Sequence, residues 1–128
     1  MLDNRLLFFY LIELYGETPE VEMKLLSRQE EIVLLSIWHL KGNAYGVTIR
    51  EHISELTGKY WSIGAIYVPL DRLWEKGLVE TWQGPTSKKR GGRSKRFYQI
   101  TAEGMKLLQE IKHVQDVLWK GFPRVVAE

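Results

Sequence analysis

The chain has 128 residues, of which 45% are hydrophobic and 27% are charged. This size and composition suit one soluble domain with a short extension, and they argue against both disorder and membrane residence. The absence of cysteine excludes disulfide frameworks, thiolate zinc sites and cysteine nucleophiles, and it fits a cytoplasmic protein. The net charge is +2, but residues 62–100 hold eight Lys/Arg against three Asp/Glu, which places +5 on this segment and −3 on the remainder. A basic patch on an acidic body is typical of a protein that binds a polyanion.

The first predicted element is a helix over residues 4–15. Its apolar run, residues 6–12, is far too short to cross a bilayer, which requires about 20 apolar residues. A signal peptide is not expected, because Asp3 offsets Arg5 and no small-residue cleavage site follows. The glycine and proline of residues 16–19 end the helix. We expect it to pack on the domain or on a second subunit.

A second helix is predicted to begin at Ser27. Glu30 stands three residues later, so the two residues form the sequence signature of a capping box. The following residues, 32–40, are apolar around most of the helical circumference. We therefore expect this helix to be buried on several sides, with Trp38 in the core. Residues 41–43 end it.

A third helix is predicted from about Tyr45 to Leu56. Ile49, Ile53 and Leu56 recur at helical spacing and mark its inner face. Residues 57–59 end this helix, and a fourth begins shortly after it. The pair therefore has the form of a helix-turn-helix.

The fourth helix is predicted to begin at Ser62, a favourable N-cap residue. Pro69 lies within it and is expected to bend the helix or tighten its first turns. Its inner face is predicted to carry Ile63, Ile66, Leu70 and Leu73. Its outer face is predicted to carry Gly64, Val68, Asp71, Arg72 and Glu75.

Two alternating segments, residues 79–83 and 97–100, flank a basic loop. Residues 88–96 contain six Lys/Arg, two adjacent glycines and no acidic residue. Two strands joined by a flexible, positively charged loop are typical of a wing that lies against a phosphate backbone. The alternative is that these charges only solvate a loop; the preceding helix-turn-helix favours the wing.

A last helix is predicted from Thr101, its N-cap, to about Lys120. Apolar residues repeat along it at alternating spacings of four, three and four. So small a domain cannot cover such a seam alone, and the same helix of a second copy is the expected partner. The predicted dimer interface consists of Leu107, Ile111, Val114, Leu118 and Trp119.

These elements predict a mainly α fold with a small β-hairpin wing, a winged helix-turn-helix with dimerisation helices at both ends. The expected units are residues 1–26, 27–101 and 102–128. The fourth helix would lie in the major groove of DNA, and the wing cations would hold phosphates. The predicted DNA-binding residues are Tyr45, Ser62, Gly64, Ala65, Tyr67, Val68, Arg72, Lys88, Lys89, Arg90, Arg93, Lys95 and Arg96.

Two of these assignments have structural alternatives. Arg72 either reaches guanine or a phosphate, or it is occupied by Glu75 one turn along the helix. Tyr67 either donates to a phosphate or packs against Trp74 or the wing. Among the other aromatic residues, Trp61 is predicted to act as a hydrophobic staple, and Trp74 and Trp82 to be half-buried around the hairpin.

Three strings of the sequence, in order and at matching separations, resemble the PadR family of transcriptional regulators. The first is similar to the opening of the family's second helix, the second to its recognition helix, and the third to its wing and the start of its last helix. The strings are residues 44–50, residues 63–73 with 75–79, and residues 90–98 with Thr101 and Gly104. The resemblance covers roughly residues 26–119, and the single helix after the wing is similar to the family's shorter-tailed branch.

The resemblance implies a homodimeric bacterial repressor that binds a palindromic operator. It implies dimerisation through the C-terminal helix, often assisted by N-terminal residues, and it places Tyr45, Tyr67 and the wing cations on or near the DNA-facing surface. Many members are released from DNA by small, often aromatic effectors near the dimer interface. At that interface Trp119 either packs against the second copy or helps to form a slot for such a ligand.

The alternative function is a winged-helix module that binds a protein partner and has no specific DNA target. An enzyme is not expected, because the sequence holds no nucleophile elbow, phosphate-binding glycine loop or paired carboxylates. No metal or cofactor is expected either, because no two histidines stand at metal-ligand spacing. The acidic pairs are interpreted as solvated helix faces or caps. They are Glu30 with Glu31 and Glu51 with Glu55.

Overall fold

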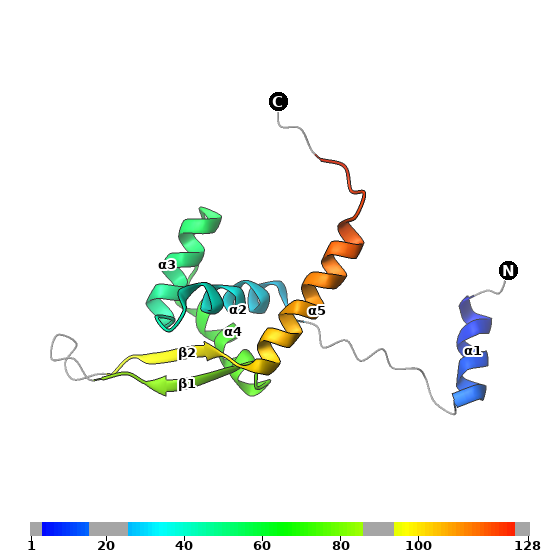
Figure 1. Ribbon diagram of the computed structural model, residues 1–128, viewed down its shortest axis with the longest axis horizontal. Coiled ribbons are helices and arrows are strands. Elements are labelled where there is room, and N and C mark those ends of the chain that lie inside the picture. The colour runs from blue at the N-terminus through cyan, green and yellow to red at the C-terminus, as the bar shows by residue number, and fades with distance from the viewer. Residues whose placement is uncertain (1–3, 16–25, 86–93, 125–128) are drawn as a thin grey trace.

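The computed structural model describes residues 4–15, 26–85 and 94–124. Within these ranges the chain forms five α-helices and a two-stranded antiparallel sheet (Figure 1). This confirms the predicted mainly helical fold with a hairpin after the helix-turn-helix. No described helix is long and apolar enough to cross a membrane. In chain order the elements are α1 (Asn4–Tyr15), α2 (Arg28–Leu40), α3 (Gly46–Thr57), α4 (Ile63–Glu75), β1 (Val79–Gln83), β2 (Arg96–Ile100) and α5 (Ala102–Trp119).

The helix starts that the sequence predicted from hydroxyl side chains are confirmed. Ser27 Oγ accepts a hydrogen bond from Glu30 N at 3.1 Å, and Glu30 Oε1 accepts one from Ser27 N at 3.3 Å. This is the predicted capping box of α2. Ser62 and Thr101 cap α4 and α5 through their own side-chain oxygens. Such caps satisfy amides that no helical carbonyl reaches, which fixes where each helix begins.

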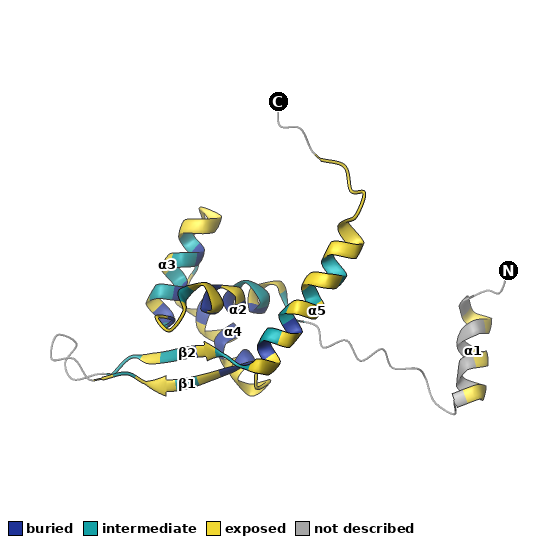
Figure 2. Cartoon of the chain, viewed as in Figure 1, coloured by how far each residue is buried: buried dark blue, intermediate teal, exposed yellow. Residues whose placement is uncertain are grey.

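The core lies where α2, α3 and α4 pack together, and the base of the hairpin closes it (Figure 2). Each of the three helices contributes aliphatic side chains at helical spacing, as expected for amphipathic helices around one centre. The first turns of α5 add one further residue. The buried apolar residues are Val33, Leu34, Ile37, Ala44, Ile49, Ile53, Ile66, Leu70, Leu73, Leu78, Val79, Tyr98 and Leu107.

One face of the hairpin is fixed to the helical body. β1 pairs with β2 along its full length, and Tyr98 of β2 is buried. The backbone N–H of Tyr98 donates to the carbonyl oxygen of Ala44 at 2.8 Å, so the segment before α3 runs beside β2. Burial raises the pKa of the Tyr98 hydroxyl above its usual value. The burial of Tyr98 and its backbone bond to Ala44 therefore fix the direction in which the hairpin extends from the helices.

α2 is less enclosed than its composition predicted. Trp38 is 42% exposed and Leu35 is also exposed, so the prediction that Trp38 lies in the core is wrong. The reason is that α3 and α4 cover the side of α2 that carries Leu34 and Ile37, while the opposite side is left open.

Two further residues of the predicted inner faces, Leu56 and Ile63, are exposed. They lie in the last turn of α3 and the first turn of α4, at the ends of the helices and away from the packed centre. Trp61, just before α4, packs against the core in a half-buried position, as expected for a staple residue. Pro69 is buried inside α4, which continues through it.

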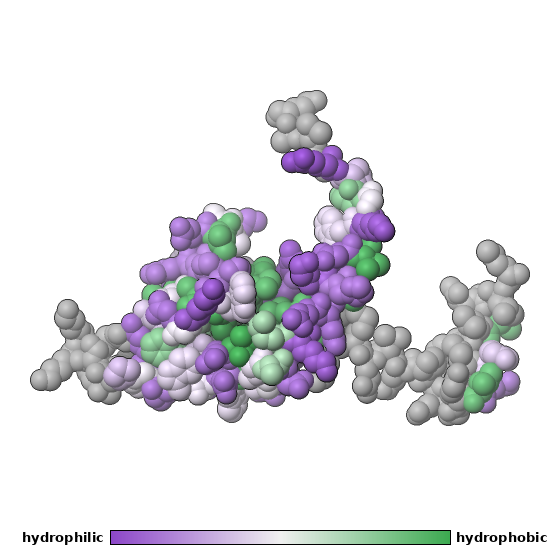
Figure 3. All heavy atoms as spheres, in the orientation of Figure 1, coloured by the Kyte–Doolittle hydropathy of each residue, from purple (hydrophilic) through white to green (hydrophobic). Residues whose placement is uncertain are grey.

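The apolar stripe of α5 is divided between the body and solvent. Leu107 is buried, Ile111 and Val114 are partly covered, and Leu118 is 75% exposed. A groove of about 460 Å³ separates α5 from the open side of α2. Hydrophobic atoms gather between these two helices (Figure 3). The groove is lined mainly by Leu35, Trp38, Met105, Leu108, Ile111 and Gln115.

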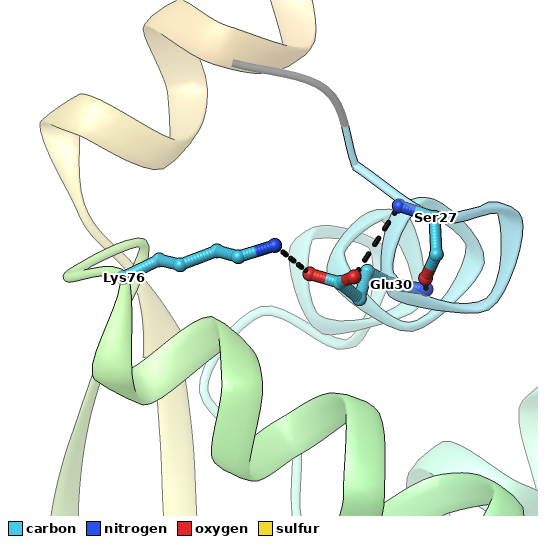
Figure 4. A network of polar contacts seen from close by, with 3 residues as sticks. All are labelled: Ser27, Glu30 and Lys76. Carbon is cyan, nitrogen blue, oxygen red and sulfur yellow. Dashed lines mark hydrogen bonds and ion pairs between the residues drawn. The ribbon is translucent and has the colours of Figure 1, made fainter.

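An ion pair between buried Glu30 and exposed Lys76 ties the start of α2 to the end of α4 (Figure 4). Glu30 is only 4% exposed, and its Oε2 lies 2.5 Å from Nζ of Lys76. Burial alone raises the pKa of Glu30, but hydrogen bonds from Lys76 and Ser27 outweigh this effect and hold its pKa below the usual value. The interpretation of Glu30 as a cap is confirmed, whereas its interpretation as a solvated residue is wrong.

Candidate nucleic-acid interface

The outer face of α4 is open along its length. Gly64, Val68 and Arg72 are exposed, as predicted, and Ser62 at the N-cap is exposed as well. A Cβ atom at Gly64 would meet no atom within 4 Å, so nothing in the described chain covers this surface. Ala65 is half-buried and contributes less to the face. The small side chains leave room for another molecule to approach the helix backbone.

The charges on this face are mixed. Asp71 and Glu75 are exposed beside Arg72. Glu75 forms no ion pair with Arg72 within the described residues, so the alternative in which Glu75 occupies this guanidinium is not observed. Arg72 is therefore available to a partner molecule. Arg72 attracts a polyanion to this face, whereas the carboxylates of Asp71 and Glu75 repel it.

A tyrosine and a lysine from distant parts of the chain meet at the start of α3. Lys95 Nζ donates to the Tyr45 hydroxyl at 2.8 Å and lies 4.0 Å from the centre of its ring. Tyr45 is the N-cap residue of α3, and Lys95 directly precedes β2. The start of a helix is electropositive because its first amides point outward, and the ammonium group adds to that potential. The cluster can hold an anionic oxygen.

Tyr67 joins this cluster from α4. Its ring lies against Gly46, the first residue of α3, and a Cβ at that position would collide with the Tyr67 hydroxyl. Tyr67 remains 44% exposed. Tyr67 therefore packs against α3. The predicted packing partners were Trp74 and the wing, so this contact was not predicted. The side chain stays accessible at the junction of α3 and α4.

Arg96, the first residue of β2, lies at the loop end of the hairpin, and its side chain reaches Trp74 of α4. Its guanidinium carbon is 5.7 Å from the ring centre of Trp74 and 5.6 Å from that of Tyr98. Its Nη2 donates to Thr81 Oγ1 at 3.4 Å. The predicted association of Trp74 with the hairpin is confirmed, but Trp74 is exposed rather than half-buried. Lys95 and Arg96 thus carry positive charge to α3 and to α4, respectively.

Some of the predicted site lies outside the described residues. These residues are Lys88, Lys89, Arg90 and Arg93 of the wing. For the described residues, the structure brings Lys95 onto Tyr45, sets Tyr67 against the neighbouring Gly46, places Arg96 beside Trp74 of α4 and leaves the outer face of α4 open. Contact of any of these residues with DNA stays a prediction.

Sequence reasoning missed three residues that shape this surface. Gly46 admits the Tyr67 ring, Phe97 contacts the Tyr45 ring, and Gly84 lies close to Phe97. A glycine directly after the tyrosine at the predicted start of the helix was an available signal for close approach. Phe97 and Gly84 gave no such signal, because a strand aromatic and a turn glycine are common in any hairpin.

Of the predicted dimer residues, only Leu118 and Trp119 at the end of α5 are exposed; Leu107 is buried in the core of its own chain, and Ile111 and Val114 are half-buried. Trp119 and Phe122 contact each other edge to face, with ring centres 5.0 Å apart, and both are exposed. Leu118 and Val117 are exposed beside them. The groove between α2 and α5 lies nearer to the body and includes Trp38, which was predicted to lie in the core.

The histidines do not form a metal centre in the described part of the chain. No group of three or more metal-ligating side chains lies close together there. His39 and His52, which are on different helices, have ring centres 5.3 Å apart. This proximity between α2 and α3 was not visible in the sequence spacing.

The comparisons with known proteins agree on one family. Residues 34–110 match the model of the transcriptional regulator PadR-like family. The match covers more than half of the chain, and this protein therefore belongs to the PadR-like family of transcriptional regulators. Regulation of transcription through DNA binding follows from that membership, and the family is not one of enzymes. No curated protein matches the sequence.

Solved structures show the same fold. A PadR-like transcription factor from Bacteroides fragilis is similar with a TM-score of 0.62 and 21% identity, over 71% of this chain and 82% of that one. A PadR-like regulator from Bacillus cereus gives a TM-score of 0.58 at 24% identity, over 71% and 84%. A PadR family regulator from Eggerthella lenta gives 0.59 at 20% identity, over 92% and 89%.

Proposed function

We propose that this protein is a homodimeric repressor that binds a palindromic operator and is released by a small, often aromatic effector. The observation that carries the DNA-binding part is the contact of Lys95 with Tyr45 at the start of α3, where Tyr67 of the open helix α4 packs against Gly46. In this proposal α4 enters the major groove, where Val68 contacts a thymine methyl and Arg72 contacts guanine or a phosphate. The cluster at α3 and the wing cations hold the flanking phosphates.

The remaining proposed contacts complete this surface. Ser62 and Gly64 allow the start of α4 to approach the bases, and Ala65 follows them on the inner edge of the face. Arg96 binds phosphate between the wing and α4. The proposed wing contacts are Lys88, Lys89, Arg90 and Arg93. Residues 27–101 would thus form the DNA-binding unit, between an N-terminal unit of residues 1–26 and a C-terminal unit of residues 102–128.

The dimer in this proposal forms through α5. Its support is the exposed apolar surface that continues from the groove beside Trp38 to Leu118 and Trp119, because a single chain leaves this surface in water. The α5 helix of a second copy has the matching apolar stripe and would cover it. The two α4 helices would then be spaced about 34–36 Å apart, one turn of DNA.

The effector part of the proposal places an aromatic ligand at Trp119. The support is an exposed indole at the end of the proposed interface, where two copies would approach each other. An effector would act by favouring a dimer whose α4 helices have the wrong spacing for the operator. We also propose a cytoplasmic location, since repression requires access to DNA.

The direct test is a gel-shift assay with the promoter DNA beside the protein's own gene. We expect a discrete complex that unlabelled promoter DNA competes away and unrelated DNA does not. Equal and weak retardation of every duplex at about 150 mM salt would contradict specific repression.

The second candidate function is a winged-helix module that binds a protein partner. The exposed groove beside Trp38 is the observation that favours it. Neutralising Lys88, Lys89, Arg90 and Arg93 together separates the two functions. This change should abolish the function of a DNA-binding protein and leave a complex with a protein partner intact.

A further inference from the structure

A continuous series of ring contacts connects the outer side of the hairpin to the start of α3. Trp82 of β1 and Phe97 of β2 are stacked, with ring centres 5.6 Å apart and planes inclined by 13°. Phe97 then meets Tyr45 edge to face at 5.4 Å. Lys95 rests on the far end of this series, over the Tyr45 ring and hydrogen-bonded to its hydroxyl.

The backbone beside Phe97 is shaped to admit its ring. The Gly84 N–H donates to the carbonyl oxygen of Lys95 at 2.8 Å, which continues the strand pairing one step beyond β1 and β2. A Cβ at Gly84 would collide with the Phe97 ring. Because Gly84 has no positive φ, the glycine is required here for space and not for its backbone conformation. Phe97 thus fills the position that a side chain would otherwise take.

The lysine is therefore held at two points that both depend on Phe97. Its carbonyl is bonded to Gly84, which lies against Phe97, and its side chain is bonded to Tyr45, whose ring Phe97 contacts. A lysine side chain without such contacts samples many rotamers and must be ordered when it binds a phosphate. Prior ordering removes that cost from the binding step.

We propose that Phe97 is a positioning residue for DNA binding: wedged between Trp82, Gly84 and Tyr45, it fixes the base of the wing so that Lys95 stands at the start of α3. This inference rests on the proposed function, because it assigns Lys95 a phosphate of the operator. Phe97 itself need not touch DNA. Its effect passes entirely through the placement of Lys95.

The first part of the test measures operator affinity for four proteins that keep the full chain. Phe97→Leu removes the ring and keeps an apolar side chain, Phe97→Tyr keeps the ring, and Lys95→Met removes the charge and keeps the stem. The fourth protein combines Phe97→Leu with Lys95→Met. Fluorescence anisotropy with promoter DNA gives each dissociation constant, and thermal melting shows that each variant is folded.

We expect Phe97→Leu and Lys95→Met each to weaken binding about tenfold, as for the loss of one good phosphate contact. The dissociation constant of the double variant should lie within about twofold of that of either single variant, because both changes remove the same contact. Phe97→Tyr should bind within about twofold of the unchanged protein. Losses that multiply in the double variant would overturn the inference, as would unchanged binding by Phe97→Leu.

The second part of the test does not need DNA. Hydrogen exchange at the Gly84 amide reports its bond to Lys95, and exchange at the Tyr98 amide reports the buried side of the hairpin. Phe97→Leu should accelerate exchange at Gly84 about tenfold and leave Tyr98 unchanged. Unchanged exchange at Gly84 would overturn the positioning role itself. A different result would overturn the proposed function instead: Phe97→Leu accelerates exchange at Gly84 as expected, but the unchanged protein does not bind DNA specifically.

Discussion

α4 and the outer half of α5 carry similar apolar residues at helical spacing but lie in opposite surroundings. Leu70 of α4 is completely buried, whereas Leu118 of α5 is 75% exposed. Helical spacing identifies the apolar face of a helix, but it does not identify what covers that face. For α4 the cover is α2 and α3 of the same chain. For α5 we propose that the cover is a second copy of the protein.

The strongest test of this comparison is a cavity in the core. Leu70→Ala should lower the free energy of unfolding by about 2–5 kcal/mol, because the surrounding helices cannot close around the missing atoms. Urea unfolding at two protein concentrations measures the loss. The loss should be the same at both concentrations, since the cover comes from one chain. A loss below about 1 kcal/mol would contradict the packing described for α4.

The matching change in α5 is Leu118→Asp. In the proposed dimer this change would bury a carboxylate without a partner, which is unfavourable. We therefore expect the dissociation constant of the dimer to increase about 100-fold, equivalent to about 2.7 kcal/mol. Size-exclusion chromatography with light scattering measures the oligomeric state, and circular dichroism should show an unchanged fold. Leu118→Met is the apolar control. If light scattering gives the same molar mass in solution for the aspartate variant and for the control, α5 is not the interface.

The ion pair between Glu30 and Lys76 sharpens the comparison, because it joins the buried carboxylate of α2 to the C-cap residue of α4. Glu30→Gln should lower the free energy of unfolding at pH 7 by about 1–3 kcal/mol. The folded-state pKa of Glu30 is lowered, so its contribution is complete above the reference pKa of 4.5 and disappears as the pH falls through the folded-state value.

Urea unfolding between pH 3 and pH 7 tests this sign. The difference between the unchanged protein and Glu30→Gln should shrink as the solution becomes more acidic. Glu51→Gln removes an exposed carboxylate of α3 and is the matched control, for which we expect little change at any pH. A difference that stays constant down to pH 3 would show that the charge of Glu30 is not its source.

The smallest effect is expected for single wing cations. Lys89→Ala should weaken binding to all DNA sequences to a similar extent and reduce the slope of log affinity against log salt by about one unit. Titrations at several salt concentrations measure the slope. An unchanged slope, or a loss confined to one DNA sequence, would show that Lys89 does not contact the phosphate backbone.

The sequence predicted well what is local. The caps at Ser27, Ser62 and Thr101 depend on residues three positions apart, and all of them are confirmed. The three core helices, α5 and the hairpin follow from the spacing of apolar residues within each element. Local chemistry therefore predicted the order of the elements and the outward face of α4.

The contacts that shape the candidate site and join α2 to the end of α4 link distant positions and were not predicted. Lys95 and Tyr45 are 50 residues apart, and Lys76 and Glu30 are 46 apart. The exposure of Trp38 was also missed, because an apolar circumference does not reveal which side neighbouring helices leave open. These properties depend on how the elements pack against one another, and the spacing of residues within one element does not show this.

The central claim, that the face formed by α4, the start of α3 and the wing binds specific DNA, is tested most directly by one titration. Fluorescence anisotropy compares the protein's own promoter duplex with a scrambled duplex at about 150 mM salt. We predict that the promoter is bound at least about 1,000-fold more tightly than the scrambled duplex. Equal, weak binding to both duplexes by the folded protein would contradict the account.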